Sequence, residues 1–167
     1  MREFVCEPLA KHHDRQAFRC GVGELDEYLH RRARQDLERH VAAVYVMVPA
    51  DQPQRIAGFY TLSATSVVLD ELPSELAKKL PRYPAVPAIL LGRLARDLRF
   101  PGLGEQLLMD ALARTLQHSH AVAAAVVLVD AKDEIARRFY ARYGFQEILQ
   151  SPNRMFLSMK ALQRLFG

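Results

Sequence analysis

Two short motifs carry residues whose types and spacing suit the chemistry of a phosphate-bearing ligand. The first, R-x-x-G-x-G, runs from Arg99 to Gly104 and opens directly onto an amphipathic helical stretch. Glycines let the backbone approach a ligand closely, and the start of a helix adds unpaired N–H groups and the positive end of its dipole. This motif therefore predicts a loop that holds a pyrophosphate.

The second motif lies downstream and also follows an apolar strand. It reads Asp133-x-x-Ala136-x-x-x-Tyr140-x-x-x-Gly144-Phe145. Asp133 has the side chain of a helix N-cap, and a neutral phenol such as that of Tyr140 can donate a proton to a leaving group. Taken from composition alone, Tyr140 is instead a core residue on the same helical face as Ala136.

The elements that must position these motifs follow from hydrophobic periodicity and from the turn residues. The nearly all-apolar stretch 123–131 is typical of a central strand that is covered on both faces and runs parallel to its neighbour. The pattern predicts an α/β (mixed α+β) fold, with a mixed sheet of about six or seven strands and helices on both faces. A right-handed β-α-β unit places the glycine loop at the carboxyl end of a strand. Strands are expected at 3–9, 41–48, 55–66, 86–97, 123–131, 145–149 and 154–159. Helices are expected at 24–39, at 72–80, from the end of the glycine loop to about residue 118, and at 133–143.

Length and composition indicate an ordinary globular protein. The 167 residues, half of them hydrophobic and a quarter charged, fit a single domain over residues 1–167. The apolar run 121–129 is far too short to span a membrane, and the N-terminus lacks the h-region of a signal peptide. We therefore expect a cytoplasmic protein. Cys6 and Cys20, the two cysteines, are expected to stay reduced.

The formal net charge is +4, and the basic residues are unevenly distributed. They gather in a predicted helix, before the glycine loop and around Tyr140. Such clusters favour a polyanionic partner, although each single arginine is compatible with a solvated helix face. The three clusters are Arg31, Arg32, Arg34 and Arg39; Arg93, Arg96 and Arg99; and Arg137, Arg138 and Arg142.

The order of these elements and motifs resembles the GCN5-related N-acetyltransferase fold. Further stretches are similar to one branch of that superfamily, the acetyltransferase toxins of type II toxin–antitoxin pairs. Members of this branch acetylate the amino group of aminoacyl-tRNA and are held inactive by a ribbon-helix-helix antitoxin. The resemblance covers nearly the whole chain through Phe18-Arg19-Cys20-Gly21 with Leu25-Asp26, Gly58 to Ser63, Leu80 to Pro84, Leu91 to Ala95 and Val129 to Asp133.

The resemblance implies that acetyl-CoA, as co-substrate, lies between the strand ending at Asp97 and the strand starting near Ala123. Tyr140 is then the general acid at the thioester sulfur. The superfamily often has Asn at the position of Asp133, a departure that bears on a contact to the pantetheine arm. The implied cofactor-binding residues are Leu94, Ala95 and Arg96 for the pantetheine and the thioester carbonyl; Gly102, Leu103, Gly104 and Glu105, with the charge of Arg99, for the pyrophosphate; and Asp133 and Ala136.

The substrate side is less well defined by the residues. Arg82 and Tyr83 can contact the acceptor end of a tRNA through charge and stacking, or they belong to a Pro-rich surface loop. Arg93 completes the predicted substrate-binding set. No general base stands out, which suits an α-amino group, since its reference pKa is about 8. Glu24 and Asp26 are the alternatives for a base.

The six histidines suggest no metal site. His12 and His13 are adjacent, and His118 lies two residues before His120, but neither pair has the additional spaced ligands of a zinc site. We therefore expect no metal.

Three functional hypotheses follow. The first is an acetyl-CoA-dependent toxin that acetylates aminoacyl-tRNA. Its implied partners are a cognate ribbon-helix-helix antitoxin, a second copy of the chain in a homodimer, and operator DNA only as the toxin–antitoxin complex. The second is an N-acetyltransferase for a small amine or a protein N-terminus. The third is a CoA-binding or DNA-binding regulatory module, which the intact Tyr140 motif disfavours as the sole role.

Overall fold

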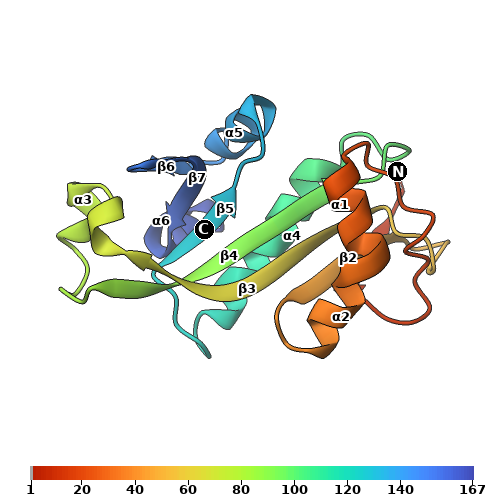
Figure 1. The fold of residues 1–167 in the computed structure, drawn as a ribbon, viewed down its shortest axis with the longest axis horizontal. Coiled ribbons are helices and arrows are strands. Elements are labelled where there is room, and N and C mark those ends of the chain that lie inside the picture. The colour runs from red at the N-terminus through yellow and green to blue at the C-terminus, as the bar shows by residue number, and fades with distance from the viewer. Residues whose placement is uncertain (1) are drawn as a thin grey trace. The chain divides into compact units, whose positions relative to one another are not determined.

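The strands form one mixed sheet in the order β1-β2-β3-β4-β5-β7-β6 (Figure 1). The computed structural model describes residues 2–167. β2 pairs antiparallel with β1 and β3, β4 and β5 pair parallel, and β7 pairs antiparallel with β5 and β6. The predicted mixed α/β fold is confirmed. The strands are β1 (Phe4–Pro8), β2 (Ala43–Pro49), β3 (Gly58–Val68), β4 (Ala85–Arg96), β5 (Val126–Asp130), β6 (Gln146–Ile148) and β7 (Ser151–Ser158).

The helices occupy most of the predicted positions. The glycine loop leads into α4, which ends at His118 as predicted, whereas α3 is much shorter than the predicted helix over 72–80. None of the helices within residues 2–167 is long and apolar enough to cross a membrane. The helices are α1 (Gly23–Glu27), the π-helix η1 (Tyr28–Arg32), α2 (Ala33–Glu38), the 3-10 helix η2 (Leu69–Glu71), α3 (Ser74–Ala77), α4 (Leu103–His118), α5 (Glu134–Ala141) and α6 (Met159–Leu165).

The chain divides into two compact units. The first comprises the described residues up to Ser63 together with Arg93–Leu112, and the second comprises Ala64–Gly92 and Ala113–Gly167. Strands β3 and β4 contribute residues to both units. The assignment of one domain to residues 1–167 stays a prediction.

In the first unit, helices cover both faces of β3. The ring of Phe59 stacks on Tyr28 of η1 at a centroid distance of 6.2 Å. A Cβ added to the neighbouring Gly58 would lie 2.6 Å from a methyl carbon of Leu107 in α4. Because successive residues of a strand point to opposite faces, η1 and α4 pack on opposite sides of β3. Position 58 has no room for a side chain because α4 approaches the strand so closely.

The predicted helix over 24–39 contains a π-helical turn, η1, that the sequence did not indicate. The wider turn has main-chain carbonyl groups that other segments satisfy. Arg15 Nη1 and Gln16 Nε2 each donate a hydrogen bond to the carbonyl of His30 at 3.0 Å. These side-chain donors compensate for the irregular backbone pairing of the turn. The buried residues Tyr28, Leu29 and Ala33 belong to one hydrophobic cluster, and Leu25 and Leu37 pack against it.

In the second unit, β5 is the buried central strand that the sequence predicts. Its first four residues, 126–129, are fully buried. Its parallel pairs with β4 run from Ala88↔Val126 to Leu91↔Val129, and β4 continues beyond them to Arg96. The hydrophobic core of this unit contains Val67, Leu72, Val86, Ala88, Val126, Leu128, Ile148 and Phe156.

Candidate active site

The glycine loop joins the end of β4 to the start of α4 in the first unit. Gly102 has a φ of +82°, a conformation that favours glycine, and nothing lies within 4 Å of the position that a Cβ would take. The next residues, Leu103, Gly104 and Glu105, form the first turn of α4. Their backbone N–H groups have no acceptor within the helix. This open, N–H-rich turn fits a pyrophosphate, and the binding itself stays a prediction.

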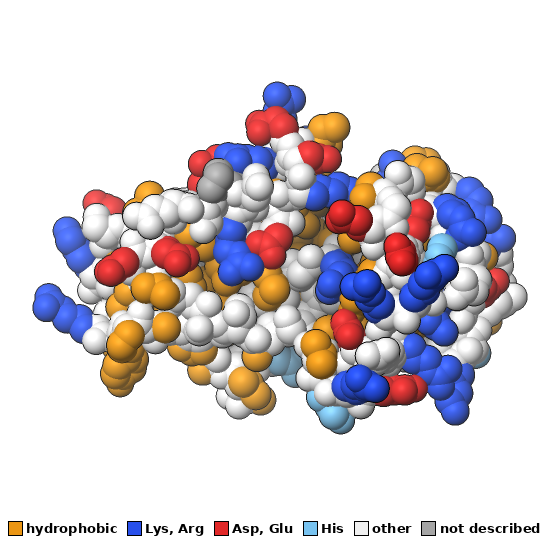
Figure 2. Space-filling view, viewed as in Figure 1, with side chains coloured by type: hydrophobic (Ala, Val, Ile, Leu, Met, Phe, Trp, Pro, Cys, Tyr) orange, Lys and Arg blue, Asp and Glu red, His pale blue; other side chains and the backbone are white. Residues whose placement is uncertain are grey.

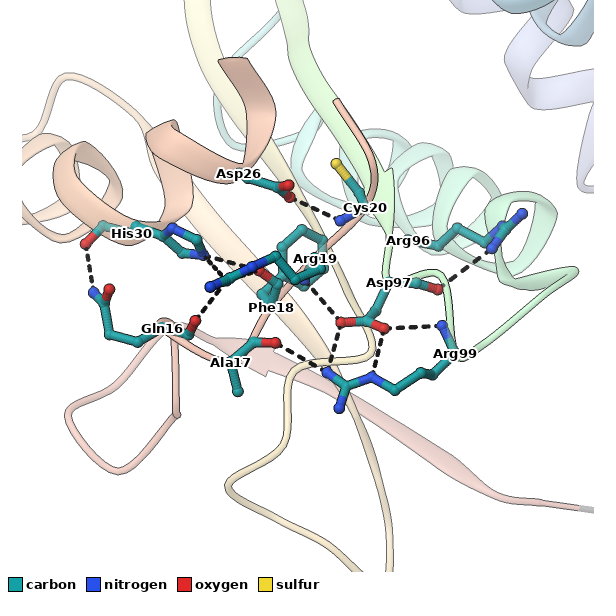
Figure 3. A network of polar contacts seen from close by, with 10 residues as sticks. All are labelled: Gln16, Ala17, Phe18, Arg19, Cys20, Asp26, His30, Arg96, Asp97 and Arg99. Atoms are coloured by element: carbon teal, nitrogen blue, oxygen red, sulfur yellow. Dashed lines mark hydrogen bonds and ion pairs between the residues drawn. The ribbon is translucent and has the colours of Figure 1, made fainter. Parts of the chain in front are cut away.

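Arg99 of this loop is bound to the carboxylate of Asp97 (Figure 3). The Nε–Oδ1 and Nη2–Oδ2 distances are both 3.0 Å, and Nη2 also donates to the carbonyl of Ala17 at 2.9 Å. The same buried carboxylate accepts hydrogen bonds from the backbone N–H groups of Arg19 and Arg99, each at 2.9 Å. The pair therefore ties the segment before α1 to the loop, a role that sequence analysis missed. A further contact of Arg99 with a pyrophosphate stays a prediction.

Burial alone would raise the pKa of the Asp97 carboxyl. The hydrogen bonds from the Arg99 side chain and from the two backbone N–H groups outweigh burial and hold this pKa below its ordinary value. In return, the hydrogen bond to Asp97 raises the pKa of Arg99. Both groups are consequently charged at neutral pH, and much of the charge of Arg99 is already balanced within the protein.

Leu94, Ala95 and Arg96 form the end of β4. Ala95 belongs to the same buried cluster as Tyr28, so its side chain faces η1. Leu94 and Arg96 point to the opposite face of the strand. Arg96 Nη1 donates to the carbonyl of Asp97 at 3.4 Å (Figure 3). The end of β4 thus has one face buried against η1 and an opposite face that carries Leu94 and Arg96. Its contact with pantetheine stays a prediction.

The helix that carries Tyr140 is fixed at both ends by residues of the second motif. At its start, the Asp133 carboxylate accepts a hydrogen bond from the N–H of Ala136 at 2.8 Å, which confirms the predicted N-cap. At its end, Phe145 N–H donates to the carbonyl of Tyr140 and Gly144 N–H to that of Ala141. With Gly144 at a φ of +96°, these bonds form a Schellman motif. The spacing of the motif is thus the spacing of two helix caps.

Replacing the N-cap residue Asp133 is expected to lower the stability of the folded protein. Asp133→Ala removes the side-chain acceptor that caps α5, so we expect the free energy of unfolding to fall by about 1 kcal/mol. Asp133→Asn is the matched control, because an amide oxygen caps a helix equally well. Urea unfolding of the three proteins tests this, and equal stability of the Ala and Asn variants would contradict the capping role.

Tyr140 lies on the buried side of α5 with only 7% of its surface exposed. Its ring makes edge contacts with Phe139 and Phe145 at centroid distances of 5.3 and 5.5 Å. Burial, and to a lesser extent the negative charge of Asp130, raises the pKa of the Tyr140 phenol. The phenol therefore stays protonated at neutral pH and can act only as a proton donor there.

The charge beside Tyr140 belongs to an ion pair that sequence analysis missed. Asp130, at the carboxyl end of β5, accepts two hydrogen bonds from Arg154 of β7, at 2.8 and 3.1 Å. The two residues are directly paired in the β5–β7 ladder. Only the strand register brings them together, because they are 24 positions apart in the sequence.

The residues predicted to bind substrate lie in both units. Arg82 and Tyr83 occupy an exposed loop of the second unit, in which Tyr83 is 64% exposed and its N–H donates to the carbonyl of Pro81. Arg93 belongs to the first unit, where it lies over the ring of Tyr28. Their contacts with a substrate stay predictions. Of the two alternative bases, Glu24 is exposed and Asp26 accepts a hydrogen bond from the N–H of Cys20 at 2.8 Å.

One group of side chains in the described chain has the composition of a metal site. Glu7, His12 and His13 bring their polar atoms within 4.8 Å of one another. However, His13 Nδ1 accepts a hydrogen bond from the N–H of Ala10, so its proton lies on Nε2, which donates to Glu7 at 2.9 Å. This pairing leaves His13 without a lone pair for a metal and gives the group a structural explanation.

Comparison with known proteins defines the family. No protein-family model matches the chain. It is 32% identical over 173 residues to a Sinorhizobium fredii protein named "Probable toxin TacT", covering 98% of this chain and 95% of the relative. It is 34% identical over 156 residues to a tRNA-acetylating toxin of Mycobacterium tuberculosis, covering 92% and 91%.

Solved structures agree with these relatives. AtaT complexed with acetyl-methionyl-tRNAfMet is 27% identical, with a TM-score of 0.91 over 99% of this chain and 100% of that chain. AtaTR bound with acetyl-CoA and a KacTA–DNA complex are each 28% identical over 98% of both chains, with TM-scores of 0.85 and 0.77. The chain belongs to the family of tRNA-acetylating toxins within the GCN5-related N-acetyltransferases.

Proposed function

We propose that this protein is an acetyl-CoA-dependent N-acetyltransferase toxin that acetylates the amino group of aminoacyl-tRNA and so blocks translation. The observation that carries the proposal is Tyr140, a buried neutral phenol on a helix that is capped at both ends by the residues of its own motif. Two comparisons support aminoacyl-tRNA as the substrate. The chain is related to the tRNA-acetylating toxin of M. tuberculosis, and its structure is similar to that of AtaT complexed with acetyl-methionyl-tRNAfMet.

The reaction needs a proton donor, an oxyanion site and a free amine. The amine nitrogen forms a bond to the thioester carbonyl carbon, the carbon–sulfur bond breaks, and the thiolate takes a proton from Tyr140. The proton that the nitrogen loses passes through water to the Tyr140 phenolate and restores the neutral phenol. Backbone N–H groups at Leu94–Arg96 stabilise the negative charge that develops on the carbonyl oxygen. The first turn of α4 holds the pyrophosphate, while Asp133 and Ala136 set the start of the Tyr140 helix. An α-amino group is partly unprotonated near neutral pH, so no protein base is required.

The partners follow from the same kinship. We assign a cognate ribbon-helix-helix antitoxin, a homodimeric state and binding to operator DNA only as the toxin–antitoxin complex. The solved KacTA–DNA complex supports the assignment of DNA as a partner of the complex. Both units of the chain form one acetyltransferase domain in this proposal, because β3 and β4 run through both. Charged tRNA is used in the cytoplasm, which is where the toxin acts.

The direct test is transfer of labelled acetyl from acetyl-CoA to a pool of charged tRNAs. Uncharged tRNA, a polyamine and a peptide with a free N-terminus are run in parallel. We expect label on charged tRNA alone. Label on the amine or the peptide with none on charged tRNA would overturn the substrate assignment and favour the small-amine or N-terminal acetyltransferase.

A further inference from the structure

Arg93 is held in an unusual setting in the first unit. Its guanidinium carbon lies 3.6 Å from the centroid of the Tyr28 ring. The Tyr28 hydroxyl donates to Asp36 Oδ2 at 2.8 Å, and the ring also stacks on Phe59 with an interplanar angle of 12°. Tyr28 is only 4% exposed, so the ring is a fixed platform. The arginine lies flat on a ring that other side chains have already immobilised.

Arg93 differs from Arg99 and Arg154 because, in the described part of the chain, its guanidinium is not paired with a carboxylate. Arg99 and Arg154 each bind a carboxylate bidentately, whereas Arg93 forms no ion pair with any carboxylate of residues 2–167. The nearby Asp36 is engaged by the Tyr28 hydroxyl instead. The face of an aromatic ring attracts the guanidinium cation, but the five N–H groups in the plane of the guanidinium do not donate hydrogen bonds to it. The platform therefore orients Arg93 and leaves its fork of donors for an external anion.

The position of Arg93 on the strand indicates the kind of anion. Arg93 and Ala95 lie on the same face of β4, the face that packs against η1. Several basic side chains lie over α1 and α2 on the face of the molecule shown in Figure 2, with Asp and Glu side chains between them. Arg31 and Arg32 of η1 and Arg39, directly after α2, are exposed, and Arg31 also forms an exposed ion pair with Glu27. A surface with several such cations suits a polyanion better than a single small ligand.

We propose that Tyr28, held by Asp36, is a positioning residue that presents the guanidinium of Arg93 to a backbone phosphate of charged tRNA. The planar fork of arginine matches a phosphate with two parallel hydrogen bonds, which a lysine cannot reproduce. The inference deepens the proposed function and rests on it. It adds Tyr28 and Asp36, which touch no substrate themselves, to the residues that determine binding of the RNA.

Steady-state kinetics with charged tRNA at several salt concentrations tests the proposal. We expect Arg93→Gln to raise the KM for charged tRNA about tenfold at unchanged kcat, and to reduce the slope of log KM against log salt by about 0.7–0.9, the change for one lost phosphate contact. Arg93→Lys keeps the charge, so the salt slope should stay while KM rises about fivefold. The KM for acetyl-CoA should not change in either variant.

Tyr28 is tested by separating its ring from its hydroxyl. Tyr28→Leu removes the platform and should match Arg93→Lys, whereas Tyr28→Phe keeps the ring and should restore most of the affinity. Arg2→Lys is the matched control, because Arg2 lies 5.2 Å from the Phe100 ring but is paired with Asp51. Because Tyr28 is buried, Tyr28→Leu can also weaken the fold. Arg93→Lys changes a less buried side chain and therefore tests the phosphate contact without removing part of the core.

The outcomes separate this inference from the proposed function. Normal transfer to charged tRNA with an unchanged KM and salt slope in Arg93→Gln would overturn the inference alone. A raised KM for acetyl-CoA would also overturn it, since the phosphate would then belong to the co-substrate. Absence of transfer by the unaltered protein would overturn the proposed function and this inference together.

Discussion

Tyr140→Phe is expected to lower kcat for acetyl transfer by about 10²- to 10⁴-fold, the usual contribution of a general acid. The ring contacts with Phe139 and Phe145 remain, and within residues 2–167 the hydroxyl makes no hydrogen bond that the substitution would break. The KM for acetyl-CoA and the midpoint of urea unfolding should therefore be unchanged. Tyr143→Phe is the matched control, because Tyr143 lies two residues after α5 and also contacts Phe139.

The pH profile provides a second readout of the same residue. Burial raises the pKa of Tyr140 above that of a free phenol, which is about 10. The acid form is thus present throughout the neutral range, so the rate should rise with pH through the pKa of the α-amino group and show no falling limb below about pH 10. Full activity of Tyr140→Phe, or a falling limb near neutrality, would contradict the assignment of Tyr140 as general acid.

Asp97→Asn is expected to cause the largest loss of stability, about 2–3 kcal/mol at pH 7. The substitution removes the charge that binds Arg99 and turns one acceptor oxygen into a donor facing N–H groups. The loss is smaller than for a fully buried pair because the Arg99 side chain is 48% exposed and can be hydrated. Urea unfolding at pH 7 measures it. Asp51→Asn, which breaks an exposed pair with Arg2, is the control and should cost little.

The same pair predicts the direction of the pH dependence. The pKa of Asp97 is lower in the folded than in the unfolded protein, so its contribution to stability is present above the unfolded value of about 3.9 and is lost as the pH falls toward the folded value. The stability difference between the unaltered protein and Asp97→Asn should therefore shrink between pH 5 and pH 3. A difference that is independent of pH would show that the ion pair is not its origin.

Features set by neighbouring residues were predictable from the sequence. The glycine loop and α4, the Asp133 cap and the buried β5 depend on local spacing and periodicity, and each lies where the sequence predicts it. The bond from Arg19 to Asp97 joins residues 78 positions apart, so only the fold reveals it. The π-turn η1 is stabilised by hydrogen bonds that Arg15 and Gln16 donate to the carbonyl of His30. The spacing of apolar residues in a helix gives no sign of such donors from another segment. Helix α6 has seven residues and follows β7 directly, leaving too short a stretch for a pattern.

The two caps of α5 have a consequence for how this protein can diversify. Asp133 and Gly144 set the ends of the helix, and Phe145 packs on the Tyr140 ring, so the Tyr140 side chain is held by residues within one short segment. The opposite side carries Ile135, which is 77% exposed. Substitutions on that outer side can accumulate without displacing the phenol. The outer surface of α5 can therefore change while the proposed proton donor stays in register.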